Sequence, residues 1–273
     1  MDKKIIFLDI DGTIMTFQGA MPESAKQALI LAKAAGHSLV LCSGRTKSEI
    51  YPELLAMDFD GIIGAAGAYV EHRGEVIHRH VVEAGQLVRM IDYFESHDLT
   101  YCLQTGEGVI FTSKNRKRFR DYFLSVGLTE ETIWKVLSAE IIEENDSRDR
   151  MNVEKAAYYG SSVCAEDIQR GIGDYFKVDG ASYGNNTVTN GEITCNGETK
   201  ATGMAYYLQH TGGSIEDTIA VGDGLNDMDM LHKAKVAIAM GNGKPETKEI
   251  ADYITDHVDK DGLFNAFKHF GLI

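Results

Sequence analysis

The chain has 273 residues, 44% of them hydrophobic and 25% charged, which is ordinary for a folded globular protein. Its formal net charge of −14 argues against non-specific binding to nucleic acid or to an anionic membrane, because both require a basic surface. The four cysteines are scattered, and there is neither a long apolar run nor a signal-like N-terminus. We therefore expect no disulfide framework, zinc site or membrane span, and a cytoplasmic location.

The first third of the chain alternates between short apolar runs and amphipathic segments. Residues 3–8 read as a buried strand, and residues 23–35 as a helix between Pro22 and Gly36. A strand, a helix and a strand are then predicted at residues 37–42, 46–57 and 61–65. This β-α-β-α-β order is typical of a parallel sheet that helices cover on both faces.

The same alternation returns near the C-terminus, whereas the middle of the chain differs. Helices are predicted at residues 199–210, 226–233, 246–251 and 260–270, with strands at 218–221 and 236–239. The middle mixes strands with helices at residues 84–97, 115–126 and 165–173, and has turn signals at Asp179-Gly180, Gly184-Asn185 and Asn190-Gly191. The predicted fold class is α/β: a Rossmann-like parallel-sheet core of residues 1–81 and 189–273, with an inserted α+β module of residues 82–188.

A pair of carboxylates, Asp9 and Asp11, directly follows the first strand in the string Asp9-Ile10-Asp11-Gly12-Thr13. Ligands of open α/β sheets bind at the carboxyl ends of strands. Two carboxylates there suit a hard cation such as Mg²⁺, and one of them can act as a nucleophile or as an acid and base. By itself the string is equally consistent with a plain turn. A calcium loop is rejected, because that pattern requires Gly and Glu where Ile14 and Ala20 stand.

Two weaker signals lie at other predicted element ends. Ser43-Gly44 follows the second strand and can bind an anion through a hydroxyl and backbone N–H groups, although local grounds favour a helix N-cap. Lys200 stands at the start of a helix, where a lysine is ordinarily solvated. Both residues gain weight only in combination with the acidic strings.

A second acidic loop, Gly222-Asp223-Gly224-Leu225-Asn226-Asp227, follows the strand at residues 218–221. Asp223 is a candidate third metal ligand, Asp227 a ligand through water, and Asn226 a partner for a phosphoryl oxygen. A Gly-Asp turn explains this loop alone, but it is a poor joint explanation of two acidic loops that each follow a buried strand.

Taken together, these strings resemble the motifs of the haloacid dehalogenase superfamily of phosphatases. The order Asp9-Ile10-Asp11-Gly12-Thr13, Ser43, Lys200 and Gly222 to Asp227 matches that of the family. The large insertion is similar to the type IIB cap of its Cof-like subfamily. The resemblance covers essentially the whole chain, and its first and last motifs are the specific ones.

The resemblance assigns a role to each residue. It implies that Asp9 is the nucleophile and a metal ligand, and that Asp11 acts as acid and base and ligates Mg²⁺ through its backbone carbonyl. The phosphoryl group would be held by Asp9, Gly12, Ser43, Gly44, Lys200 and Asn226. Asp223 would complete the metal shell, and Asp227 would support its loop. No catalytic position departs from the family pattern.

The resulting expectation is a Mg²⁺-dependent phosphatase that hydrolyses a small phosphorylated metabolite, a sugar phosphate or a phosphorylated cofactor, through an aspartyl-phosphate. A phosphohexomutase is the main alternative, because type IIB caps also resemble those of some mutases. A phospho-Asp signalling or binding protein fits less well, because its acceptor lies on a later strand and Asp11 is present here to activate water. We expect no nucleic-acid or membrane partner, and a monomer or small homo-oligomer.

Overall fold

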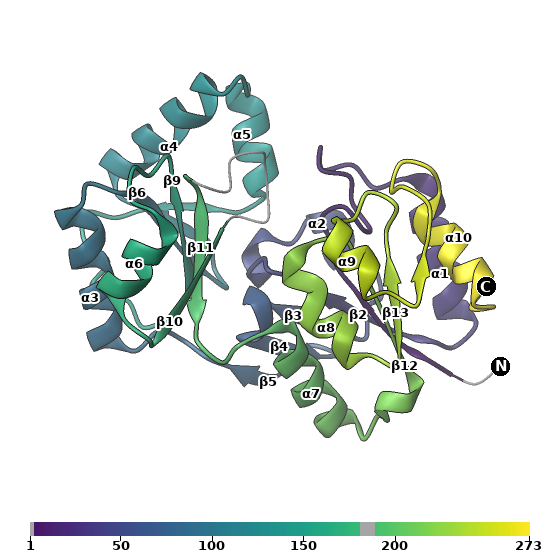
Figure 1. Cartoon of the computed structure of the whole chain (residues 1–273). Coiled ribbons are helices and arrows are strands. Elements are labelled where there is room, and N and C mark those ends of the chain that lie inside the picture. Colours follow the sequence, from purple (N-terminus) through teal and green to yellow (C-terminus); the bar gives the residue numbers. More distant parts are fainter. Residues whose placement is uncertain (1–2, 181–188) are drawn as a thin grey trace. The chain divides into compact units, whose positions relative to one another are not determined.

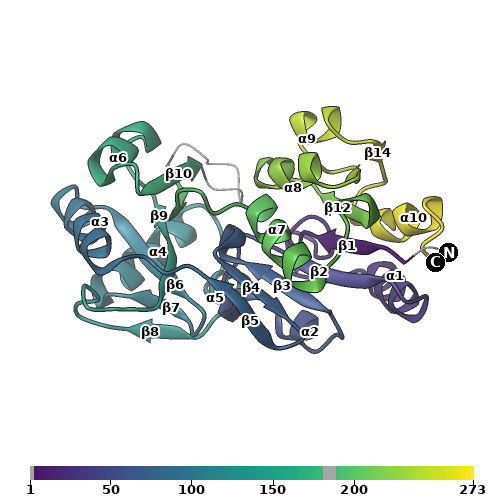
Figure 2. The same cartoon turned by 90° about the horizontal axis from the view of Figure 1, so that it is seen from below.

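The computed structural model describes residues 3–180 and 189–273. It divides into two compact units (Figures 1 and 2). The core unit consists of Met1–Gly44, Leu55–His78 and Thr199–Ile273. The inserted unit consists of Arg45–Leu54 and Arg79–Glu198. No helix in the described part of the chain is long and apolar enough to cross a membrane.

An eight-stranded sheet forms the centre of the core unit, in the order β14-β13-β12-β1-β2-β3-β4-β5. All pairs from β14 to β3 are parallel, and β4 runs antiparallel to β3. The strands are β1 (Ile5–Leu8), β2 (Ser38–Cys42), β3 (Gly61–Gly64), β4 (Tyr69–His72), β5 (Glu75–Arg79), β12 (Thr218–Gly222), β13 (Val236–Ala239) and β14 (Tyr253–Ile254). The predicted α/β class with a parallel core is confirmed.

Helices cover this sheet because its central strands are apolar on both faces. In β1, Phe7 faces a cluster with Met204 and Tyr207 of α7, while Ile6 and Leu8 point to the opposite face and are equally buried. The helices of the core unit are α1 (Glu23–Ala34), α7 (Lys200–Thr211), α8 (Met228–Lys233), α9 (Pro245–Glu249) and α10 (Gly262–His269). Short 3₁₀ helices lie at η2 (Ala65–Gly67), η3 (Ile215–Asp217) and η4 (Leu225–Asp227).

The order of the strands brings three strand ends to one edge of the sheet. β1 lies between β12 and β2, and Leu8 is in register with both Val221 and Leu41. Because all three strands are parallel, the residues that follow them leave the sheet at neighbouring points. The first residues after the three strands are Asp9, Ser43 and Asp223.

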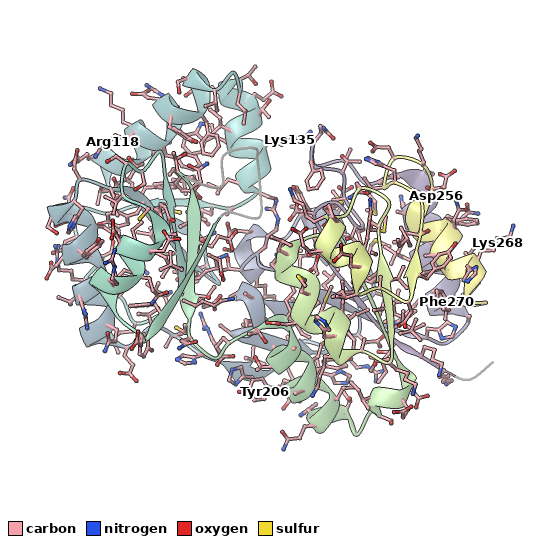
Figure 3. All side chains as sticks on the ribbon, viewed as in Figure 1. Arg118, Lys135, Tyr206, Asp256, Lys268 and Phe270 are labelled. Atoms are coloured by element: carbon pink, nitrogen blue, oxygen red, sulfur yellow. The ribbon has the colours of Figure 1, made fainter. Side chains whose placement is uncertain are left out.

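The inserted unit contains a second, mostly antiparallel sheet in the order β10-β11-β9-β6-β7-β8. Its strands are β6 (Thr100–Thr105), β7 (Val109–Phe111), β8 (Ile141–Glu143), β9 (Val153–Tyr159), β10 (Phe176–Gly180) and β11 (Gly191–Cys195). Its helices are α3 (Ala84–Ser96), α4 (Ser113–Ser125), α5 (Glu130–Leu137) and α6 (Ala165–Ile172), and η1 (Lys47–Glu49) and α2 (Pro52–Leu55) lie in its short first segment. Figure 3 shows the side chains on these elements, with Arg118 labelled on α4.

Besides a shift of the first border from residue 82 to Arg79, the observed units differ from the expected borders in two places. Strand β11 pairs with β9 and β10, so residues 189–198 belong to the inserted unit although they were expected in the core. The segment Arg45–Leu54 also joins the inserted unit, where Glu49 accepts a hydrogen bond of 2.7 Å from the Gln104 amide. Both differences arise from pairing across long sequence separations. The turn expected at Gly184-Asn185 lies outside the described residues.

A buried carboxylate, Asp60, ties together the amino end of the core sheet. It accepts hydrogen bonds from the Lys33 ammonium at 2.7 Å and from the Leu39 backbone N–H at 3.1 Å, and Arg73 approaches at 3.4 Å. Burial raises the pKa of Asp60, but these positively polarised partners outweigh burial, and the pKa lies below its usual value. The folded state therefore binds this proton more weakly than the unfolded state does.

We expect Asp60→Asn to lower the free energy of unfolding by about 2 kcal/mol at pH 7, because it removes a charged acceptor from these donors. The contribution of ionised Asp60 is fully present above the unfolded-state pKa, about 4, and is lost as the pH falls below it. Urea unfolding of wild type and variant should thus show a difference that is constant from pH 7 to 5 and shrinks below pH 4. A difference that grows on acidification would contradict the assignment.

Candidate active site

The nucleophile expected from the sequence, Asp9, continues the ladder of β1. Its backbone N–H donates to the Val221 carbonyl at 3.0 Å, and its side chain is 5% exposed. The chain then turns sharply, with Gly12 at φ +85°, a conformation that favours glycine. A Cβ on Gly12 would overlap the Asp223 carboxylate and crowd the Phe17 ring. Gly12 thus allows the two acidic loops to approach each other.

Ser43 lies buried at the end of β2. Its N–H donates to the Ile63 carbonyl at 2.8 Å, and its own carbonyl accepts from Ala66 N–H at 3.1 Å. The helix-capping function that local sequence favoured for Ser43 falls instead to Thr46, which precedes η1 and whose backbone N–H and hydroxyl both donate to Glu49.

Lys200 is buried, unlike an ordinary helix-start lysine. It is the first residue of α7, whose N-cap Thr199 accepts a hydrogen bond from the Thr202 N–H. The Lys200 ammonium donates to Asp9 Oδ1 at 2.6 Å and to Asp227 Oδ1 at 2.5 Å. One cation therefore joins the loop that follows β1 to the loop that follows β12.

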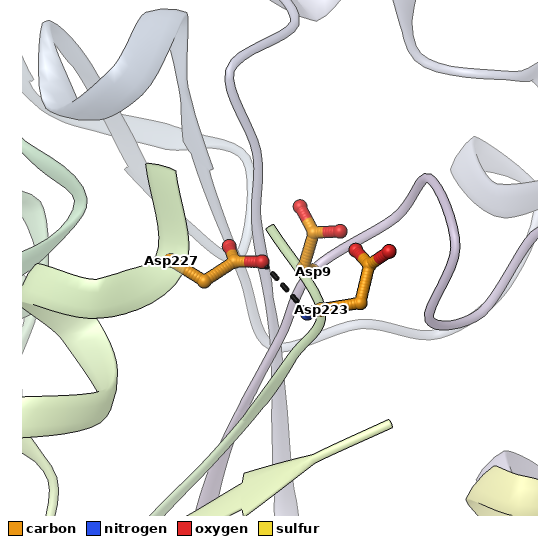
Figure 4. Close-up of side chains that lie close together, drawn as sticks. All are labelled: Asp9, Asp223 and Asp227. Atoms are coloured by element: carbon orange, nitrogen blue, oxygen red, sulfur yellow. Dashed lines mark hydrogen bonds between the residues drawn. The ribbon is translucent and has the colours of Figure 1, made fainter. Parts of the chain in front are cut away.

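The loop after β12 is held in shape by the side chain of Asp227. Asp227 Oδ2 accepts from the backbone N–H groups of Asp223 at 2.9 Å and Gly224 at 2.8 Å, and the first of these bonds is drawn in Figure 4. Its other oxygen binds Lys200. With both oxygens engaged, Asp227 holds the loop and the lysine, which leaves Asp9 and Asp223 to face a cation. Asn226 lies exposed on the same loop.

Three buried carboxylates meet at this edge of the core sheet (Figure 4). Asp9, Asp223 and Asp227 each offer one oxygen, and these oxygens lie within 4.8 Å of one another. Among the described residues, this group does not include the side chain of Asp11, which is partly exposed. The structure thus brings together the side chains of three predicted ligands, Asp9, Asp223 and Asp227. The fourth, Asp11, was expected to bind the metal through its backbone carbonyl and not through its side chain.

The buried charges of this group shift one another's pKa values. Burial raises the pKa of Asp9, and the neighbouring Asp227 carboxylate raises it further despite Lys200. Burial and Asp227 likewise raise the pKa of Asp223 to about 7. Burial disfavours the charged form of Lys200, but Asp227 and Asp9 outweigh it and raise its pKa. One ammonium thus faces three carboxylates, and an all-oxygen donor set with excess negative charge fits Mg²⁺.

Asn242 is a further residue of this site, which no sequence motif indicated. It lies between β13 and α9, and its Nδ2 donates to the Gly12 carbonyl at 2.8 Å and to Asp223 Oδ2 at 3.1 Å. The only local signal is the string Gly241-Asn242-Gly243 shortly after a buried strand, which is also the pattern of an ordinary turn.

Comparisons with known proteins agree with this geometry. The family model for haloacid dehalogenase-like hydrolases matches residues 6–267. The putative phosphatase YkrA of Bacillus subtilis is 26% identical over 276 residues, covering 100% of both chains. The pyridoxal phosphate phosphatase YbhA of Escherichia coli is 27% identical over 273 residues, with 93% of each chain covered.

Solved structures of phosphatases share the fold of this chain. The HAD subclass IIB sugar phosphatase BT4131 superposes with a TM-score of 0.79 and 26% identity, covering 99% of this chain and 100% of that one. Family model, relatives and fold thus agree with the resemblance that the motifs indicated. The chain belongs to the haloacid dehalogenase-like hydrolases, and is a phosphoric monoester hydrolase of their Cof-like type.

Proposed function

We propose that this phosphatase depends on Mg²⁺, acts on a small phosphorylated metabolite and works through an aspartyl-phosphate at Asp9. The observation that carries the proposal is the position of Asp9. Its buried carboxylate lies at the end of the central strand β1, is bound by Lys200 and shares a group with two further carboxylates. Phosphoryl transfer requires such in-line positioning together with positive charge on the phosphoryl oxygens.

In the first step, a carboxylate oxygen of Asp9 attacks phosphorus, and the bond from phosphorus to the leaving oxygen breaks. Asp11, in its protonated form, gives its proton to that oxygen. The Lys200 ammonium, already 2.6 Å from Asp9 Oδ1, holds the nucleophile in place and faces the incoming charge. Asp9 and Asp223 would hold Mg²⁺ together with the Asp11 carbonyl, and the ion would neutralise phosphoryl charge.

In the second step, water attacks the phosphorus of the aspartyl-phosphate. Asp11, now a carboxylate, takes a proton from that water, so that phosphate leaves and the free Asp9 carboxylate returns. Ser43 and the N–H group of Gly44 would bind the phosphoryl oxygens, and Asn226 would do so from the second loop. The Gly12 N–H, expected to join them, donates instead to the Met15 carbonyl at 2.7 Å. Asp227 takes no part in the bond changes, because it keeps Lys200 and the Asp223 loop in position.

Two similar proteins support a substrate class. One relative is a pyridoxal phosphate phosphatase, and one structural neighbour is a sugar phosphatase. We propose a sugar phosphate or a phosphorylated cofactor for this chain.

Turnover in ¹⁸O-labelled water separates hydrolysis from the mutase alternative. With Mg²⁺ and a panel of hexose phosphates and pyridoxal 5′-phosphate, we expect released phosphate to carry one labelled oxygen by mass spectrometry, because water attacks the aspartyl-phosphate. An isomerised sugar phosphate with little free phosphate would instead identify a phosphohexomutase and overturn the proposal.

A further inference from the structure

Asn242 joins two loops of the site that are far apart in the sequence. Its two amide hydrogens reach the Gly12 carbonyl, on the loop after β1, and Asp223 Oδ2, on the loop after β12. The Gly12 carbonyl can only accept and the Val258 backbone N–H can only donate, so the orientation of the amide is settled. Its Oδ1 accepts the Val258 backbone N–H at 2.9 Å. All three hydrogen bonds of the Asn242 side-chain amide thus go to protein groups, and together they fix its orientation.

The surrounding loop is built to bring Asn242 close to Asp223. The Lys244 N–H donates to the Asp223 carbonyl at 2.9 Å, and the Met240 N–H donates to the Gly222 carbonyl at 3.0 Å. A Cβ on Gly243 would lie 2.9 Å from the Met240 carbonyl oxygen and 3.2 Å from that of Asp223, so the close approach requires glycine. The segment after β13 is thus fastened to the acidic loop at its backbone as well as at its side chains.

We infer that Asn242 is a positioning residue of the metal site, which sets the direction of the Asp223 carboxylate and ties it to the Asp9-Asp11-Gly12 loop. The reason is mutual repulsion. Asp223 shares a buried group with two other carboxylates, which push it away from them, and the Asn242 amide is the donor that holds its Oδ2. Donors behind a metal-binding carboxylate fix its orientation, and losing them typically weakens metal binding 10–100-fold.

This inference rests on the proposed Mg²⁺ dependence, and its test measures binding directly. Isothermal titration of Mg²⁺ into wild type and Asn242→Leu should show at least about tenfold weaker binding by the variant, because leucine removes both donors at similar volume. Asn242→Ser retains one donor and should fall between the two. The kcat of Asn242→Leu at saturating Mg²⁺ should lie closer to the wild-type value than its activity at low Mg²⁺ does.

Thr247→Val is the matched control. The Thr247 hydroxyl donates to the Gly224 carbonyl at 3.1 Å and supports the same loop without touching a carboxylate of the group. It should lower the melting temperature and leave the Mg²⁺ affinity unchanged.

Four outcomes overturn the inference. If Asn242→Leu and wild type bind Mg²⁺ equally, Asn242 has only a structural role. If Thr247→Val weakens binding as much, the effect is a general loosening of the loop. If wild type binds no Mg²⁺, the proposed metal dependence falls together with this inference. Should Asn242→Leu not fold, equal binding by Asn242→Ser and wild type overturns it.

Discussion

Replacing Asp9 by asparagine is expected to abolish metal-dependent phosphatase turnover. The amide is nearly isosteric and can still accept the Lys200 hydrogen bond, but it supplies neither a nucleophilic oxygen nor the negative charge that attracts a cation. Loss of a nucleophile typically lowers kcat by a factor on the order of 10⁴ or more. The measurement is hydrolysis of p-nitrophenyl phosphate by both proteins, each with Mg²⁺ and with a chelator.

Asp60→Asn provides the matched control for this experiment. The chemical change is identical and Asp60 is also buried in the core unit, but it precedes β3 at the amino end of the sheet, whereas Asp9 follows β1 at the carboxyl end. The control should lose stability and retain turnover per folded molecule. Near-normal turnover by Asp9→Asn would refute the aspartyl-phosphate mechanism.

The strand ends of the site could be predicted from the sequence because their signals are local. Each of β1, β2 and β12 is a short apolar run, followed at once by a polar residue next to glycine or by an acidic pair. A parallel sheet then requires such residues to share an edge. The side chains of Asp9 and Asp223 accordingly lie together in the structure.

Features that depend on distant contacts were not predictable in the same way. The burial of Lys200 depends on Asp9 and Asp227, and Asn242 acts on Gly12, which lies 230 residues earlier in the chain. No pattern within a window of sequence encodes these distances. The pairing of β11 with β9 is equally non-local, which explains the shifted border of the inserted unit.

One wrong helix prediction is explained by a proline within the predicted helix itself. Residues 46–57 were expected to form one helix, but the structure has η1 at Lys47–Glu49 and α2 at Pro52–Leu55. Pro52 has no N–H to continue a helix, and a proline disfavours helical backbone in the residue before it. Ile50 already has an extended ψ of 132°. The apolar periodicity therefore correctly indicated that side chains of this segment are buried, but it wrongly indicated one continuous helix.

Removing the positive charge of Lys200 is expected to destabilise the fold in a metal-dependent way. Lys200→Met leaves three buried carboxylates without their ammonium, which should cost about 3–5 kcal/mol of unfolding free energy in the presence of a chelator. On the proposed Mg²⁺ dependence, the ion should bind the folded acidic group and restore part of this loss. Urea unfolding with chelator and with Mg²⁺ measures both effects, and kcat should fall by a factor on the order of 10² or more.

Two further variants decide whether charge balance is the cause. In Lys200→Met with Asp227→Asn, one negative charge leaves together with the positive one, so the double variant should be more stable than Lys200→Met alone, which is a coupling that independent sites lack. Lys155→Met, at another buried lysine paired with Glu192 at 2.6 Å, should lose stability without any response to Mg²⁺. If Mg²⁺ rescues Lys155→Met as well as Lys200→Met, the ion acts on the protein generally and not at the acidic group. If it rescues neither, Asp9 and Asp223 do not hold the metal, because a site relieved of its competing ammonium would otherwise bind the ion and stabilise the fold.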